Sequence, residues 1–133
     1  MRKHAEVHIS PPGARMRLHC PFARTGAHYV VWQLEGSTEI CLFSPVEAKK
    51  LNKSSCEPPL FDDTQTLYDP WDGLHNTAAT PYHLVLKAGH ALLVPKFWWI
   101  ACSASSPSLA VWRPWITHTC IPEYEATRRS ELE

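Results

Sequence analysis

Apolar and polar residues alternate along this chain in short runs, and turn-forming residues separate the runs. Twelve Pro and five Gly interrupt the sequence, so few stretches are long enough for a helix. Short strands at close spacing, with turns between them, favour an antiparallel sandwich or barrel. The runs that predict strands are rich in β-branched and aromatic side chains and stand at residues 29–34, 39–43, 82–86, 91–94, 98–103 and 108–112.

Two glycine-containing turns shape the expected sheet. Residues 35–38 (EGST) separate the first two runs, and this pattern predicts a β-hairpin with Gly36 at a positive φ. Residues 87–90 (KAGH) form a second turn, in which Gly89 has the same role. Pro95 is expected to end a strand at the barrel rim, and residues 97–99 (FWW) are expected to fill the barrel mouth.

Helical and irregular segments are few. Residues 46–52 follow Pro45 and predict one or two helical turns. Residues 53–79 are polar and rich in turn residues, which predicts a long loop. The tail at residues 122–133 is polar and is compatible with a short helix. We expect one domain over residues 1–133, with its core at about residues 15–115.

Composition narrows the classes of partner and compartment. Lys and Arg number 13, as do Asp and Glu, so the formal net charge is zero. A neutral chain offers no electrostatic reason to bind nucleic acid. No apolar run is long enough to span a membrane, and the first residues lack the apolar stretch of a signal peptide. Five Cys, an odd number without a CxxC pair, fit a reducing setting, so we expect an intracellular protein, soluble or within a particle.

Three segments occur in an order that is familiar from one family. Residues 32–45 read WQLEGSTEICLFSP, residues 86–99 read LKAGHALLVPKFWW, and residues 108–112 read SLAVW. Together they resemble the JmjC-like, or cupin-8, family of iron/2-oxoglutarate oxygenases over about residues 15–115. The resemblance implies an all-β fold, a double-stranded β-helix of the cupin or jelly-roll type with short helices added.

The resemblance also implies an Fe(II) site of two His and one carboxylate, and here most of its positions hold other residues. His19 matches the first ligand, Pro21 stands at the carboxylate, and Ile100 stands where a His follows Trp-Trp. Neither Pro nor Ile carries a side-chain donor for a metal. Thr38 occupies the position of the basic residue that binds 2-oxoglutarate. We therefore expect His19 to be a remnant metal ligand, with no catalytic residue and no cofactor.

Other side chains near the strands could rebuild a metal site, and the candidates are Cys20, His28, His83 and His90. A lone His in a strand is more often a hydrogen-bonded polar residue than a ligand. Four carboxylates within residues 62–72 could bind Ca²⁺ weakly, but their spacing is not that of an EF-hand, and a solvated loop is the simpler interpretation. Cys41 and Cys102 are expected to be small buried hydrophobes.

Two hypotheses of different classes follow. The first is a non-catalytic cupin or JmjC-like module, a pseudoenzyme that serves as a structural or protein-interaction subunit of a larger assembly. The altered ligand positions, the short chain and its six Trp favour it, because a small barrel leaves apolar surface that a partner should cover. The alternative is an iron/2-oxoglutarate-dependent oxygenase, a hydroxylase or demethylase, with a rearranged site that uses Fe(II) and 2-oxoglutarate. A third, weaker interpretation is a small-molecule-binding cupin without a metal.

Overall fold

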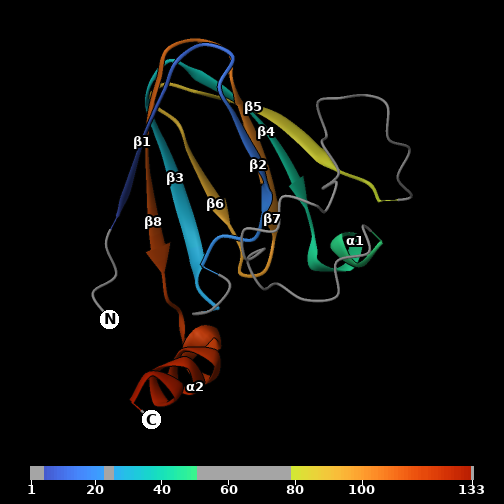
Figure 1. The fold of residues 1–133 in the computed structure, drawn as a ribbon, viewed down its shortest axis with the longest axis vertical. Helices are drawn as coiled ribbons and strands as arrows, with labels where there is room; N and C mark the ends of the chain where they lie inside the picture. The colour runs from blue at the N-terminus through green and yellow to red at the C-terminus, as the bar shows by residue number, and fades with distance from the viewer. Residues whose placement is uncertain (1–4, 23–25, 51–78, 133) are drawn as a thin grey trace.

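Two four-stranded antiparallel sheets pack face to face (Figure 1). The structure, a computed structural model, describes residues 5–22, 26–50 and 79–132. Sheet A has the strand order β1-β8-β3-β6, and sheet B has the order β2-β7-β4-β5. The strands are β1 (Glu6–Ser10), β2 (Arg15–His19), β3 (His28–Glu35), β4 (Ser37–Phe43), β5 (Tyr82–Lys87), β6 (Ala91–Val94), β7 (Trp99–Ala104) and β8 (Ser108–Trp115).

The pairing of the strands is that of a jelly roll. β1 pairs with β8, β2 with β7, β3 with β6 and β4 with β5, so the first half of the chain runs antiparallel to the second half. The two halves wind together, and successive pairs fall alternately in sheet A and sheet B. This confirms the prediction of an all-β double-stranded β-helix.

Short helices complete the described chain. α1 (Pro45–Lys49) follows β4, η2 (His118–Cys120) follows β8, and α2 (Ile121–Leu132) occupies the polar tail. Both predicted helical segments are confirmed, although α1 is shorter than residues 46–52 and α2 begins at Ile121. The predicted loop at residues 53–79 lies outside the described residues except for Ala79. Within the described part, no helix combines the length and apolar character that a bilayer-spanning helix requires.

The predicted hairpin at Gly36 is wrong in its pairing. β3 pairs with β6 and β8 in sheet A, whereas β4 pairs with β5 and β7 in sheet B. Gly36 has the expected positive φ of 71°, and a Cβ there would collide with the carbonyl oxygen of Pro107. The turn therefore carries the chain tightly across from one sheet to the other. Gly89, at φ 84°, lies in the turn that leads back from β5 in sheet B to β6 in sheet A.

A strand before residue 15 was not predicted. β1 pairs with β8 in the register Val7↔Val111 and forms an edge of sheet A. Val7 and Ile9 point to the outside of the sheet, where they are 62% and 81% exposed, while His8 lines the interior. β1 alternates in the way a strand should, but its polar side faces inward.

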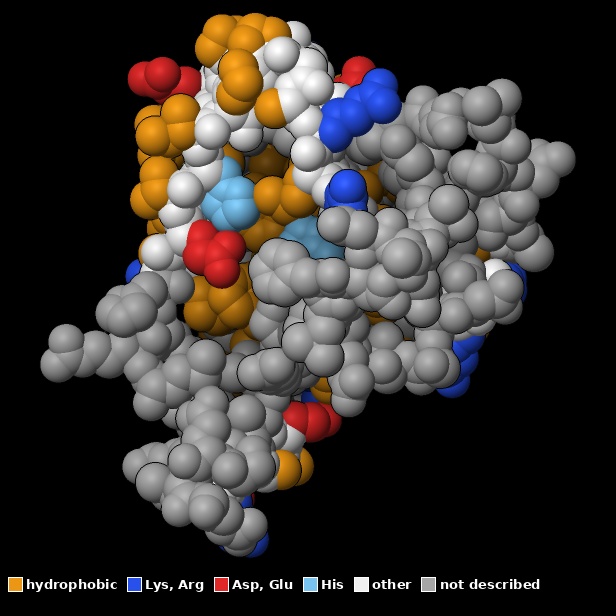
Figure 2. Space-filling model, in the orientation of Figure 1, with side chains coloured by type: hydrophobic (Ala, Val, Ile, Leu, Met, Phe, Trp, Pro, Cys, Tyr) orange, Lys and Arg blue, Asp and Glu red, His pale blue; other side chains and the backbone are white. Residues whose placement is uncertain are grey.

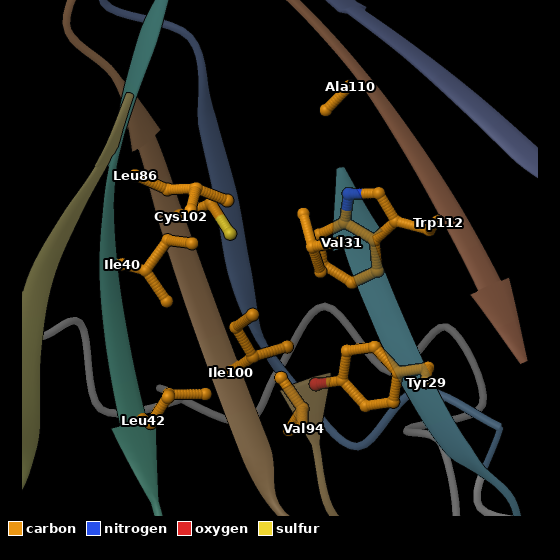
Figure 3. Packing of buried hydrophobic residues seen from close by; sticks show 10 residues of the cluster. All are labelled: Tyr29, Val31, Ile40, Leu42, Leu86, Val94, Ile100, Cys102, Ala110 and Trp112. Carbon is orange, nitrogen blue, oxygen red and sulfur yellow. The ribbon is translucent and has the colours of Figure 1, made fainter. Parts of the chain in front are cut away.

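The main core fills the space between the sheets (Figure 3). Cys102 is one of its members, and burial raises the pKa of its thiol to about 12, as expected for a small buried hydrophobe. The hydroxyl of Tyr29 points across the core toward Ile100 and Val94 and has no hydrogen-bond partner among the described residues. The buried members are Tyr29, Val31, Ile40, Leu42, Leu86, Val94, Ile100, Cys102, Ala110 and Trp112.

A second apolar cluster covers the outer face of sheet B. Trp99 belongs to it and is 2% exposed, so Trp99 does not fill the barrel mouth as predicted, whereas its neighbour Trp98 packs against the main core. The strand alternation explains this difference, because adjacent residues face opposite sides of a sheet. The cluster, called the covered face below, consists of Leu18, Cys20, Cys41, Phe43, Ala48, Ala79, Trp99 and Ala101.

Candidate functional site

A cavity of about 210 Å³ opens between the two sheets. Figure 2 shows His side chains set among hydrophobic ones at a hollowed area of the molecular surface. Met16 and Trp112 contribute apolar walls, and His8 and Arg15 contribute polar ones. The volume is below the usual range of about 300–1,000 Å³ for small-molecule sites.

Three polar side chains in this cavity satisfy one another. Gln33 is 1% exposed and donates from Nε2 to the hydroxyl of Ser108, 2.7 Å away. The hydroxyl of Thr38 donates to Oε1 of Gln33 at 3.1 Å and lies 3.1 Å from the Ser108 hydroxyl. Because the network closes on itself, it holds β3, β4 and β8 together and leaves little polar capacity for a ligand.

Aromatic rings form a stack beside the cavity. The ring of His8 lies 4.7 Å from that of Trp112, and the ring of His19 lies 6.2 Å from it. Nδ1 of His19 donates to the backbone carbonyl of Arg17 at 2.8 Å. Burial is the main cause that lowers the pKa of His19, and the hydrogen bond to Arg17 opposes it. His19 is therefore held neutral, with its Nδ1 already engaged.

Of the positions that the resemblance assigns to a metal site, some are neighbours in the structure and others are not. His19 on β2 pairs directly with Ile100 on β7, so these two positions are neighbours. Ile100 is wholly buried in the main core and offers no donor atom. Pro21 lies in the turn after β2, and Thr38 belongs to the network with Gln33. This set of side chains does not fit a three-ligand Fe(II) site.

The residues proposed to rebuild a site are spread over the molecule. Cys20 lies in the covered face, and His83 faces outward on β5 opposite Cys41. His90 is exposed in the turn before β6. Among the described residues, no three His, Cys, Asp or Glu side chains are close enough together to hold a metal ion. The carboxylates of residues 62–72 lie outside the described residues.

His28 uses both ring nitrogens in hydrogen bonds. Its Nδ1 accepts from the backbone N–H of Lys96 at 2.9 Å. That bond makes Nε2 the protonated nitrogen, which lies 3.2 Å from the hydroxyl of Thr117. His28 thus connects β3 to the segments after β6 and β8, as a structural residue would.

The outer face of sheet A carries a broad apolar surface. The register places Val30 beside Leu93, and Trp32 beside Val111, on the side that faces away from the core. Trp32 is 41% exposed and Leu93 is 58% exposed. In Figure 2, hydrophobic side chains line the left edge, where this face lies. The face, called the open face below, comprises Val7, Ile9, Val30, Trp32, Leu34, Ala91, Leu93, Leu109, Val111, Arg113 and Trp115.

Sequence reasoning did not identify the open face as a site. The signal was present in β3, where Tyr29, Val31 and Gln33 alternate with Val30 and Trp32, so that both sides of the strand are largely apolar. Such a strand is expected where both faces of a sheet are covered. His8 was also missed, because β1 was not predicted as a strand.

Comparisons with known proteins support the fold. No family model matches the chain, and no curated protein matches its sequence. Drosophila melanogaster CENP-C bound to CAL1 is similar in structure, with a TM-score of 0.51 and 6% identity over 84% of this chain and 60% of that one. The CENP-C cupin domain alone gives 0.51 and 6% over 84% and 59%.

An enzyme shares the same fold. Hydroquinone 1,2-dioxygenase PnpCD, in complex with Cd²⁺ and 4-hydroxybenzonitrile, has a TM-score of 0.50 and 14% identity over 86% of this chain and 58% of that one. The chain thus spans about three-fifths of the length of these structures. At such low identity the likeness shows the fold alone, which is a cupin fold.

Proposed function

We propose that this chain is a non-catalytic cupin module that serves as a structural or protein-interaction subunit of a larger intracellular assembly. The open face of sheet A carries the proposal. Exposed apolar side chains from all four strands of one sheet form a surface of the kind that marks a protein–protein contact. Aromatic residues such as Trp32 and Trp115 are typical anchors of such contacts.

The arrangement around the cavity supports a non-catalytic role. Ile100 offers no donor beside His19, and Thr38 is committed to Gln33 and Ser108. These are the positions at which the JmjC-like resemblance would require a metal ligand and a cosubstrate anchor. These contacts support the proposal that the module is a pseudoenzyme related to that family, and the described side chains give no support to the oxygenase alternative.

The similar structures are compatible with this proposal without deciding it. One of them, the cupin protein CENP-C, is bound to another protein, CAL1. Another, hydroquinone 1,2-dioxygenase, is an enzyme. Because one fold hosts both functions, the function of this chain has to be inferred from its own surface and site residues.

The test compares single charged substitutions on the two sheets. The tagged chain is purified gently from the cells that make it, and its mass is measured by size exclusion with light scattering. We expect the wild type in a complex of defined stoichiometry and Trp32→Lys at the mass of the free chain. Val85→Lys, on the outer side of sheet B and 51% exposed, is the matched control and should stay in the complex.

Circular dichroism of each variant checks that the barrel is folded. A wild-type chain that migrates alone would overturn the proposal, as would a Trp32→Lys variant that stays in the complex. The oxygenase alternative is tested separately by anaerobic addition of Fe(II) and 2-oxoglutarate. A visible charge-transfer band and a thermal shift would favour it over the proposal.

A further inference from the structure

A groove of about 420 Å³ is cut into the open face of sheet A. It lies where β3 and β8 run side by side and extends past the end of β8. Two tryptophans, Trp32 and Trp115, contribute to its walls, and both are largely exposed, at 41% and 55%. The lining residues are Val30, Trp32, Arg113, Pro114, Trp115 and Ile116.

Arg113 is the charged residue in this otherwise apolar groove. It stands on β8 opposite Val30 of β3 and is exposed. Within the described residues, no hydrogen bond, ion pair or ring contact of Arg113 is found. In the free protein, water solvates its guanidinium. A partner that covers the groove removes that water. It must therefore supply a hydrogen-bond acceptor of its own, because an unpaired buried guanidinium would weaken binding.

A second copy of the chain does not supply that acceptor through the same face. In a two-fold contact the open face meets itself, so Arg113 approaches apolar side chains or the Arg113 of the other copy. β3 and β8 carry one carboxylate, Glu35, at the far end of β3 and five residues from Val30, about 17 Å along the strand. Glu6 on β1 stands opposite Trp112, but it lies on the side of the strand away from Val7 and contacts His8 at 3.0 Å. Charge complementarity therefore favours a different protein as the occupant.

We propose that the groove binds a segment of a partner protein that presents large apolar side chains next to an aspartate or glutamate. The apolar side chains pack between Trp32 and Trp115, and the carboxylate pairs with Arg113. A planar guanidinium suits this pairing because it donates two parallel hydrogen bonds to one carboxylate. This inference rests on the proposed function, and it adds the chemical class of the partner.

The test uses a displayed library of random peptides, selected against the folded chain. We expect enrichment of peptides that combine large apolar residues with Asp or Glu. Arg113→Gln should weaken binding of a selected peptide about tenfold, as should replacing the peptide acid by its amide. The two changes together should cost little more than one alone, because they remove the same contact. Lys87→Gln, which removes an exposed positive charge on sheet B, is the control and should leave binding unchanged.

The outcomes separate this inference from the proposed function. Peptides that need Trp32 but bind Arg113→Gln as well as the wild type would overturn the acidic class and leave a protein-interaction face in place. Peptides whose binding survives both Trp32→Lys and Arg113→Gln would place the contact elsewhere and count against both. Self-association that competes with the peptides would identify a second copy as the occupant and also overturn the inference.

Discussion

The two sheets of this barrel differ in how far the apolar side chains on their outer sides are buried. On sheet B, Trp99 points away from the main core and is nevertheless 2% exposed, as a member of the covered face together with Ala48 of α1 and Ala79. On sheet A, Trp32 also points away from the core and is 41% exposed. Both are tryptophans on outward-facing strand positions, yet only one is part of a core.

The short helix α1 contributes Ala48 to the covered face and is fixed in place by polar contacts. Glu47 of α1 accepts a hydrogen bond from the backbone N–H of Thr80 at 2.7 Å, which ties the helix to the segment before β5. Lys50 pairs with the same carboxylate at 2.9 Å, and these contacts lower the pKa of Glu47. An outward apolar position therefore belongs to a core on sheet B, where the chain supplies a cover, and is exposed to solvent on sheet A.

The largest expected effect comes from truncating the two tryptophans. Trp99→Ala should reduce the free energy of unfolding by about 3–5 kcal/mol, because it removes a fully packed aromatic side chain. Trp32→Ala should cost about 1 kcal/mol or less, because much of that side chain is already in water. Urea unfolding of the isolated chain measures both. Equal losses of stability would mean that Trp99 and Trp32 are equally buried, which would contradict the difference between the two faces.

Alkaline pH offers a second test of the cover. Burial raises the pKa of Cys41 from 9.0 to about 11, so the folded state keeps a proton that the unfolded state releases. The resulting stability is complete below about pH 9 and is lost as the pH rises toward 11. Between these values the wild type should lose about 1 kcal/mol per pH unit more than Cys41→Ala.

The matched control for this pH dependence introduces a thiol on the open face. Leu93→Cys places a cysteine at a position that is 58% exposed in the wild type. An exposed thiol should not change how the free energy of unfolding varies with pH. Urea unfolding at a series of pH values gives the slopes. Parallel curves for wild type and Cys41→Ala would show that Cys41 is not enclosed.

Loosening α1, which contributes Ala48 to the covered face, should have an intermediate effect. The hydroxyl of Ser44 caps α1 by accepting from the backbone N–H of Glu47 at 3.3 Å. Ser44→Ala should therefore cost about 1 kcal/mol in urea unfolding. Ser105→Ala, at an exposed turn position, is the control and should change stability little. A Ser44 variant as stable as its control would indicate that α1 contributes little to the cover.

The smallest effect is expected from a charge on the open face. Leu93→Lys should change the free energy of unfolding by about 0.5 kcal/mol or less, since the side chain is mostly exposed. It should also raise the solubility of the isolated chain, because it breaks an apolar surface. Precipitation curves with ammonium sulfate measure this. A loss of stability as large as that of Trp99→Ala would show that Leu93 is packed against the chain.

Local features of the fold were accessible from the sequence, and the pairing of strands was not. The positive φ of Gly36 and Gly89 followed from their place between apolar runs. Whether the strands beside such a turn pair with each other depends on contacts with β7 and β8, which are distant in sequence. For this reason the expected hairpin became a crossing between sheets.

The candidate site was likewise predictable only in its local features. The resemblance identified Ile100 and His19, and the register indeed places them side by side, but the role of His19 as a remnant ligand stays a prediction. The sequence of β3 shows that both of its sides are largely apolar, but periodicity does not tell which of them faces the core and which forms the open face. That choice is made by the packing of the two sheets.

The pairing of β1 with β8 also determines when this protein can fold. In sheet A the first strand of the described chain, β1, pairs with the last, β8. Most contacts in the protein likewise join residues that are far apart in sequence. A topology of this kind has a high contact order and folds slowly. During synthesis β1 emerges first and finds its partner only after residue 115 has left the ribosome. Until then its apolar side chains Val7 and Ile9 lie on an unpaired strand and are available to chaperones.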